Sequence, residues 1–258
     1  MKAIEIMEGL FALAEAGDYT ESCDTCKAGD PEAEVSRVAV AMFPTPDVLR
    51  QAAAWGAELL IVHEPMYYNH RDVHSEEPLE MEKRALAERT GLTVWRYHDH
   101  THATRPDIIA VGQLDALDLA GEMVLTDGGD RVEYILEKPL TPLELKARME
   151  EKWGLQNIRL CGTRETPCRR ISCMFGAPGK AAFERLVQPD CEMMLIGEAT
   201  EWSMAEYARD AHQLGHTKAL FILGHEGSER EGMVYTAKLL RKMYPELTVQ
   251  YFESGEVY

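Results

Sequence analysis

Histidines and carboxylates follow three short apolar segments of this 258-residue chain. Each segment fits a buried strand, so potential ligands stand where strands end. Imidazole nitrogens and carboxylate oxygens bind divalent metal ions, whereas histidines that serve only as core residues would not be expected to gather in this way. The pattern therefore predicts a metal site. The segments and the residues after them are 59–62 with His63 and Glu64, 92–97 with His98, Asp99, His100 and His102, and 219–223 with His225 and Glu229.

The last of these groups has helical spacing. His225 and Glu229 are four residues apart where a helix is expected to begin, so both side chains lie on one face of that helix. Such a pair, taken alone, is more often a solvated surface contact, and its weight comes from the repetition at three strand ends. Glu198 and Glu201, after the apolar segment 191–196, are lower-ranked candidates.

The order of elements predicts an α/β fold. Helix 46–57, with Thr45 as its N-cap and Pro46 in its first position, lies between two strands and therefore makes them parallel. The strands before the first two ligand groups belong to this layer, and ligands at the carboxyl edge of such a sheet commonly form a site. The expected strands are 35–42, 59–62, 92–97, 134–137, 157–161, 170–175, 191–196, 219–223 and 247–252, and the expected helices are 2–16, 46–57, 78–90, 141–153, 201–214 and 229–242.

Two short motifs have competing interpretations. Cys23 and Cys26 have CxxC spacing, but no second pair follows at zinc-site spacing. Ordinary thiols are therefore expected, with redox or metal roles as alternatives. The glycine-rich stretch 176–180 precedes a helix, where it could cradle phosphate. It lacks the full phosphate-loop pattern, so a tight strand-to-helix turn is the expected structure.

Composition limits the class of protein. The hydrophobic content of 45% is enough for a sizeable core. The net charge of −17 argues against a nucleic-acid partner, because no basic surface is available to displace counterions from phosphates. No apolar run approaches the length of a membrane helix, and no leader segment precedes the first helix. Six cysteines in a chain of this length indicate reduced thiols and a cytoplasmic location.

Several motifs resemble those of the Nif-three-like family (Ngg-one interacting factor three), also called GTP cyclohydrolase type 2. LLIVHEPMYY resembles the family's LLIVHHP segment, and GDPEAEV at 29–35 resembles its opening motif. WRYHDHTHA resembles AHTNLDA, and GHEGSEREG resembles the closing GH-x-x-x-E-x-x-G motif, the most specific of the four. The resemblance covers nearly the whole chain in order.

The resemblance implies a fold of two related α/β lobes with mixed sheets that form one metal-binding cleft. Lobe 1 is expected over residues 1–125, to which 230–258 could return, and lobe 2 over 126–229. No additional inserted domain of the kind found in longer members is expected.

The resemblance also implies a dinuclear centre with five ligands. His63, His225 and Glu229 match the family pattern directly. Glu64 stands where the family has histidine, and His102 stands where it has aspartate, so one carboxylate and one imidazole have exchanged places. The set keeps three imidazoles and two carboxylates, which suit Zn, Fe, Mn, Co or Ni without selecting one.

The implied function is a metal-dependent hydrolase that acts on a small, nucleotide-like substrate through a water bridged by two divalent ions. His98, Asp99 and His100 are expected to donate protons or to orient the ligands. The alternative is a metal-binding, metal-delivery or regulatory protein without turnover. The resemblance further implies a hexameric ring of identical chains.

Overall fold

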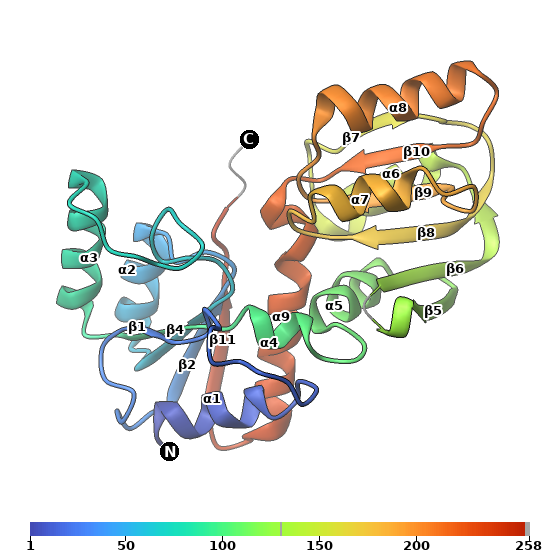
Figure 1. The fold of residues 1–258 in the computed structure, drawn as a ribbon. Coiled ribbons are helices and arrows are strands. Elements are labelled where there is room, and N and C mark those ends of the chain that lie inside the picture. Colours follow the sequence, from blue (N-terminus) through green and yellow to red (C-terminus); the bar gives the residue numbers. More distant parts are fainter. Residues whose placement is uncertain (130, 256–258) are drawn as a thin grey trace. The chain divides into compact units, whose positions relative to one another are not determined.

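The computed structural model describes residues 1–129 and 131–255, which form two compact units. Unit 1 comprises Met1–Ile109 and Gly232–Gly255, and unit 2 comprises Ala110–Glu231. Each unit has one mixed β-sheet with helices against it (Figure 1). The α/β class with mixed sheets that the sequence predicts is confirmed.

The sheet of unit 1 places the two strands that precede the first ligand groups side by side. In spatial order it consists of β1 (Cys26–Ala28), β4 (Thr93–Arg96), β3 (Leu59–Val62), β2 (Arg37–Ala41) and β11 (Thr248–Phe252). β4, β3, β2 and β11 are parallel, and β1 at the edge is antiparallel to β4. Val62 pairs with Arg96, so β3 and β4 end at the same edge.

Two helices cover one face of this sheet. The Thr45 hydroxyl accepts a hydrogen bond from the Val48 amide at 3.1 Å, which caps the start of α2 (Pro46–Trp55) as the sequence predicts. α3 (Pro78–Thr90) ends at Gly91, whose φ of 71° lies in the left-handed region. Apolar side chains between helices and sheet form one cluster, which includes Val48, Leu49, Ala52, Ala87, Ala39, Ala41, Leu60, Val62 and Val94.

α1 (Ala3–Phe11) packs on the opposite face of the sheet. Its Phe11 ring lies 6.5 Å from that of Trp95 and 6.0 Å from that of Tyr97, and the Tyr97 hydroxyl donates a hydrogen bond to the Leu10 carbonyl. β3 is therefore buried on both faces, which explains why its sequence is a continuous apolar run instead of an alternating one.

Unit 2 contains a six-stranded sheet in which β8, β9 and β10 are parallel. β5–β6, β6–β8 and β10–β7 are antiparallel pairs. In spatial order the strands are β5 (Gly121–Thr126), β6 (Arg131–Leu140), β8 (Cys168–Met174), β9 (Met193–Ile196), β10 (Ala219–Ile222) and β7 (Arg159–Gly162).

Helices cover both faces of the sheet of unit 2. α5 (Ile108–Leu117) and α6 (Pro142–Trp153) contribute to the cluster that holds Met193 and Leu195 of β9. α7 (Lys180–Leu186) and α8 (Glu201–Gln213) contribute to the cluster that holds Met194 and Ile196. Successive side chains of β9 thus enter opposite cores, as the period of a strand requires.

Two further helical segments and one long helix complete the chain. They are α4 (Asp99–His102), the short 3-10 turn Asp127–Gly129 and α9 (His225–Met243).

Some elements differ from the sequence-based expectations. The helix predicted over 2–16 ends at Phe11, so Leu13 does not extend its apolar face and is 41% exposed. β1, α4, α5 and β5 were not expected: β1 and α4 are short, and β5 is an edge strand with mostly exposed or half-buried residues. α9 begins at His225, four residues before its expected start.

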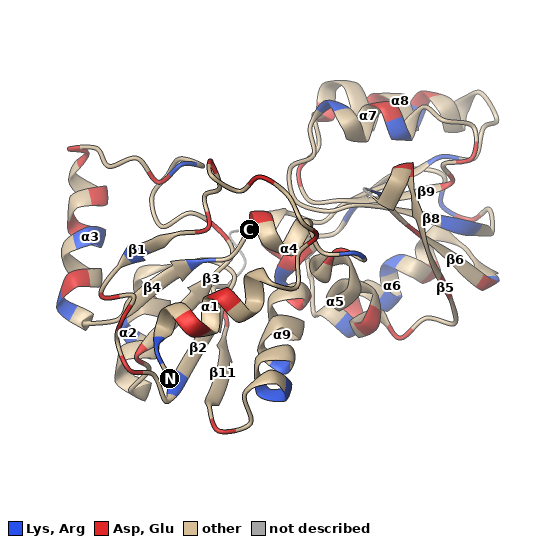
Figure 2. Cartoon of the chain, turned by 60° about the horizontal axis from the view of Figure 1, so that its bottom comes forward, with Lys and Arg blue, Asp and Glu red and all other residues tan. Residues whose placement is uncertain are grey.

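The surface helices carry both signs of charge. α3 carries basic and acidic side chains in equal number, and α8 carries mainly acidic ones with one arginine (Figure 2), as is typical of solvated helix faces. Among the described residues, no helix combines the length and apolar character that crossing a membrane would require.

Truncation of Phe221 tests the core of unit 2. Its side chain is fully buried, so Phe221→Ala should lower the free energy of unfolding by about 3–5 kcal/mol. Leu214→Ala in the same unit, where the side chain is 77% exposed, should change it by less than about 0.5 kcal/mol. Urea unfolding followed by circular dichroism measures both, and equal losses would contradict the assigned core.

Candidate metal centre

The predicted ligands of unit 1 lie where β3 and β4 end. The Tyr97 amide donates to the Val62 carbonyl at 2.8 Å, which extends the pairing of the two strands by one residue. The amides of His63 and Glu64 both donate to the Met42 carbonyl, which turns the chain sharply at the end of β3. Pairing of neighbouring parallel strands therefore brings His63 close to the histidines that follow Tyr97.

Asp24 holds the histidine-rich turn in place. Its buried carboxylate accepts hydrogen bonds from the amides of His98, Asp99 and His100, at 2.7, 3.1 and 2.8 Å, and contacts His100 Nδ1 at 2.7 Å. A carboxylate at the start of a helix satisfies amides that have no partner within the helix. α4 is a single turn, so this side chain determines where its histidines point.

His63 has the environment of a metal ligand. Its side chain is fully buried, and its Nδ1 lies 3.0 Å from the Tyr97 carbonyl, which favours the tautomer with the proton on Nδ1 and the lone pair on Nε2. Burial, assisted by His98 and His102, lowers the pKa of His63 well below its usual value, so the imidazole is neutral. A neutral imidazole is the form that binds metal.

Three imidazoles meet in unit 1. His63, His98 and His102 each offer a nitrogen, and these nitrogens lie within 4.8 Å of one another. The rings of His63 and His98 stack at 4.6 Å, and those of His63 and His102 meet edge to face at 5.1 Å. His102 Nδ1 lies 2.8 Å from an oxygen of Asp107, the carboxylate–histidine arrangement that orients metal-binding imidazoles.

Glu64 also lies in this region. Its carboxylate is buried and offers an oxygen within 4.8 Å of a nitrogen of His63. The buried Arg96 guanidinium lies 3.9 Å from Glu64 Oε2, and its Nε donates to the His63 carbonyl at 3.0 Å. Arg96 therefore orients both residues of the His63-Glu64 pair.

The ligand pair of unit 2 lies in the first turns of α9. His225 Nε2 is 3.3 Å from Glu229 Oε2, as expected for positions i and i+4 on one helix face. His225 Nδ1 is 2.7 Å from Glu198 Oε1, so Glu198 orients the imidazole from the opposite side. Glu201, the other lower-ranked candidate, instead pairs with Arg159 on the surface.

Two glycines allow α9 to approach the sheet of unit 2. A Cβ on Gly176 would lie 2.5 Å from Glu229 Oε1, and the φ of 66° at Gly176 disfavours any L side chain. A Cβ on Gly197 would lie 2.5 Å from Ser228 Oγ, which accepts the Gly176 amide hydrogen bond. The glycine-rich stretch 176–180 is thus the expected strand-to-helix turn, and its first residue adjoins a predicted ligand.

The three residues predicted to transfer protons have different surroundings. His98 and Asp99 face each other, with Nδ1 and Oδ1 2.9 Å apart. The His100 ring stacks against both Phe11 and Tyr19, at 4.1 Å each, and is held by Asp24. These contacts give His100 a clear packing role, while proton transfer by any of the three stays a prediction.

His70 is a further candidate ligand that the sequence did not single out, and it lies beside Cys23, for which metal binding was one of the alternatives. Together with His98 and Asp99 they offer four donor atoms within 4.8 Å of one another. The CxxC spacing pointed to Cys23 only as one of several alternatives. Cys26 does not belong to this group, and its thiol donates a hydrogen bond to the Ala28 carbonyl.

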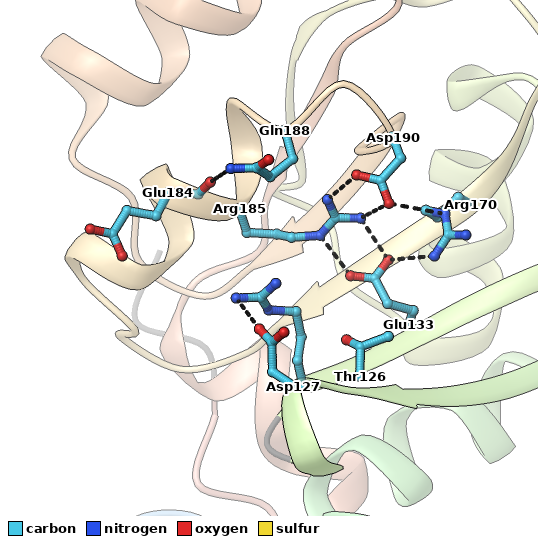
Figure 3. A pocket seen from close by; sticks show the side chains of 9 residues that line it. Thr126, Asp127, Glu133, Arg170, Glu184, Arg185, Gln188 and Asp190 are labelled. Carbon is cyan, nitrogen blue, oxygen red and sulfur yellow. Dashed lines mark hydrogen bonds and ion pairs between the residues drawn. The ribbon is translucent and has the colours of Figure 1, made fainter.

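Unit 2 also has an open cavity of about 420 Å³, lined by arginines and carboxylates (Figure 3). Arg185 forms ion pairs with Glu133 and Asp190, each at 2.7 Å, and Arg170 lies 3.7 Å from Glu133. None of the predicted metal ligands lines this cavity. Each arginine of the lining pairs with a carboxylate of the same lining, which indicates a structural network.

The fold and these donor groups define a class: an α/β protein with histidine and carboxylate groups suited to divalent metal ions at the ends of its parallel strands. A profile of the Duf34/NIF3 (NGG1p interacting factor 3) family matches residues 1–256, so the chain belongs to that family. This confirms the resemblance seen in the motifs.

Relatives in sequence and solved structures are similar to this chain over most of its length. Proteins named GTP cyclohydrolase 1 type 2 homolog from Clostridium acetobutylicum and Streptomyces coelicolor are 22% and 26% identical. The alignments cover 82% and 78% of this chain and 79% and 74% of those proteins. The solved protein ybgI, of unknown function, superposes with a TM-score of 0.77 at 19% identity over 100% of both chains. A Bacillus cereus protein related to NIF3 gives 0.74 at 11% identity over 100% of this chain and 98% of its own.

Substitution of Gly176 tests the close approach to Glu229. Gly176→Ala should lower the affinity for divalent ions by about tenfold or more, because the carboxylate of Glu229 must move. Gly179→Ala is the matched control: Gly179 also has a positive φ, of 60°, but a Cβ there would meet none of the described residues within 4 Å beyond its chain neighbours. Calorimetric titration with Zn²⁺ measures both, and equal affinities in the two variants would contradict this role of Gly176.

Proposed function

We propose that the chain binds two divalent metal ions and hydrolyses a small, nucleotide-like molecule. The proposed ligands are the five residues that the family resemblance assigned from the sequence, namely His63, Glu64, His102, His225 and Glu229. The observation that carries the proposal is the group in unit 1, where the buried, neutral His63 faces further imidazoles within 4.8 Å. A histidine with no role as a ligand would gain little from burial among other histidines.

The chemistry of the donors fits divalent ions. Three imidazoles and two carboxylates suit Zn, Fe, Mn, Co or Ni. Two ions of this kind would supply Lewis-acid polarisation of a carbonyl or phosphoryl oxygen and activation of water. Glu64 and Glu229 are 6% and 2% exposed, and bound divalent ions would offset part of the cost of burying their carboxylates.

The chain's own residues preorganise the donors. The Tyr97 carbonyl fixes the tautomer of His63, Asp107 orients His102, and Glu198 orients His225. Arg96 holds the turn of residues 63 and 64 through the His63 carbonyl. Preorganised ligands lose less entropy on binding and keep a reacting site rigid.

The choice of substrate rests on the relatives. Their name, GTP cyclohydrolase 1 type 2 homolog, makes GTP the first molecule to test. A protein that only binds or delivers metal would share the donors and would differ by the absence of turnover.

Metal analysis tests the ligands directly. Protein purified without chelators should contain at least about two divalent ions per chain, and His63→Ala and Glu229→Ala should each reduce this content substantially, because each removes a donor. His216→Ala, at an exposed position, is the control and should leave the content unchanged. Elemental analysis by mass spectrometry measures the ions. A metal-free parent, or equal content in all variants, would refute the site.

Turnover distinguishes the hydrolase from a metal-delivery protein. The metal-loaded chain should release product from GTP or another member of a nucleotide panel, and His63→Ala should lower the rate by about 100-fold or more. Chromatography of the reaction mixtures measures product. Metal-replete protein that turns over no member of the panel, yet passes its ions to a chelator within minutes, would support delivery instead.

A further inference from the structure

A second group of donors in unit 1 differs from the proposed hydrolytic ligands. It consists of the Cys23 thiol, the imidazoles of His70 and His98 and the Asp99 carboxylate, whose donor atoms all lie within 4.8 Å of one another. They come from three separate segments: the loop after α1, the loop after β3 and the start of α4. The group is partly open to solvent, because His70 is exposed while Cys23 is 4% exposed.

We propose that Cys23, His70, His98 and Asp99 bind one zinc-type ion, at a site distinct from the five residues proposed above. One thiolate, two imidazoles and one carboxylate form a four-ligand set of the kind zinc adopts. In a tetrahedral zinc site, neighbouring donor atoms are about 3.3–3.6 Å apart, as the usual bond lengths require. Here the Cys23 sulfur lies 3.4 Å from Asp99 Oδ1, within that range. His98 Nδ1 lies 2.9 Å from the same oxygen, a hydrogen-bond distance that a bound ion would widen by a few tenths of an ångström.

The three segments are held in position by contacts of their own. Asp99 Oδ2 accepts hydrogen bonds from the Cys23 amide at 3.0 Å and from the Ser22 hydroxyl at 2.8 Å. These bonds leave Asp99 Oδ1 directed at the Cys23 thiol and the His98 ring. A carboxylate anchored through one oxygen and presenting the other is a preorganised metal ligand.

The loop that carries His70 is fixed by buried charges. Asp72 pairs with Lys27 at 3.1 Å and with Arg96 at 3.4 Å, and Arg96 also donates to the His70 carbonyl. Lys27 belongs to β1, which follows the Cys23 segment, so this network connects the two loops that supply ligands. The ligands are therefore close together before an ion binds.

Binding would deprotonate Cys23. Burial raises the pKa of the Cys23 thiol to about 12, so the sulfur stays protonated as long as no metal ion is bound. On binding, the S–H bond breaks, the sulfur lone pair forms the bond to the ion and the proton passes to solvent, with no change of oxidation state. The two anionic ligands balance the charge of a divalent ion.

The site would cross-link the segments that surround the hydrolytic ligands. His98 stacks on His63, so an ion on the Cys23 group would restrain the ring that His63 packs against. This proposal gives His98 and Asp99 a ligand role, which differs from the proton transfer predicted from the sequence. It also explains why Cys23 lies among potential metal ligands whereas Cys26, in the same CxxC motif, hydrogen-bonds to the backbone.

Cobalt substitution tests the site, because thiolate bound to Co²⁺ gives a charge-transfer absorption band in the near ultraviolet that imidazole and carboxylate ligands do not give. The metal-free chain titrated with Co²⁺ should develop this band. Cys23→Ser should abolish it, and Cys26→Ser, the same change three residues away, should retain it. His70→Ala, which alters an exposed side chain and should leave the fold intact, should weaken the Co²⁺ affinity measured from the band by about tenfold or more.

Two further measurements keep the outcome unambiguous. His63→Ala should keep the band, which separates this site from the proposed hydrolytic centre. X-ray absorption of the zinc-loaded parent should detect zinc–sulfur scattering, averaged over every zinc ion bound per chain, a result that needs no variant to fold. No band in the parent, or an undiminished band in Cys23→Ser, would overturn the proposal and leave the group a hydrogen-bonded cluster.

Discussion

The arrangement of donors in unit 1 depends on one buried carboxylate. Asp24 accepts three amide hydrogen bonds from residues 98–100 and contacts the His100 ring, so it determines the direction in which a single helical turn leaves β4. A turn of four residues cannot hold itself together, because helix formation requires more hydrogen bonds than one turn provides. Charge-assisted bonds to an ionised side chain supply that missing stability. The positions of His98 and His102 follow from it, and so do both candidate metal groups of unit 1.

The sequence predicted most of the framework because its signals are local. Helix ends are signalled within a few residues, by Thr45 before Pro46 at the start of α2 and by the glycine after Thr90 at the end of α3. Strands buried on both faces are signalled by short apolar runs, as in β3, β9 and β10. The spacing of His225 and Glu229 likewise follows from helix geometry alone. The role of Asp24 lay beyond such reasoning, since its partners are more than seventy residues away along the chain. For the same reason the sequence could not pair Cys23 with Asp99, or assign Gly176 to the approach of Glu229.

Glu64 and His102, the two residues at which the proposed ligand set departs from the family pattern, each have surroundings that suit their own side chain. Glu64 lies near the Arg96 guanidinium, a setting suited to a carboxylate, and His102 has Asp107 behind its Nδ1, a setting suited to an imidazole. Each residue thus has surroundings appropriate to its own chemistry. Family membership gives the fold and a name shared by relatives, whereas the chemistry of this chain rests on such particular surroundings.

The position of β11 in the sheet has a consequence for biosynthesis. β11 is the last of the described strands in sequence order, yet it pairs along its length with β2, near the amino terminus. The whole of unit 2 is therefore translated before the sheet of unit 1 can be completed. Because domains generally fold as they emerge, unit 2 has its full sequence available first, and the edge of β2 stays open until β11 has been translated. Premature termination after residue 231 would leave that edge exposed and prone to aggregation.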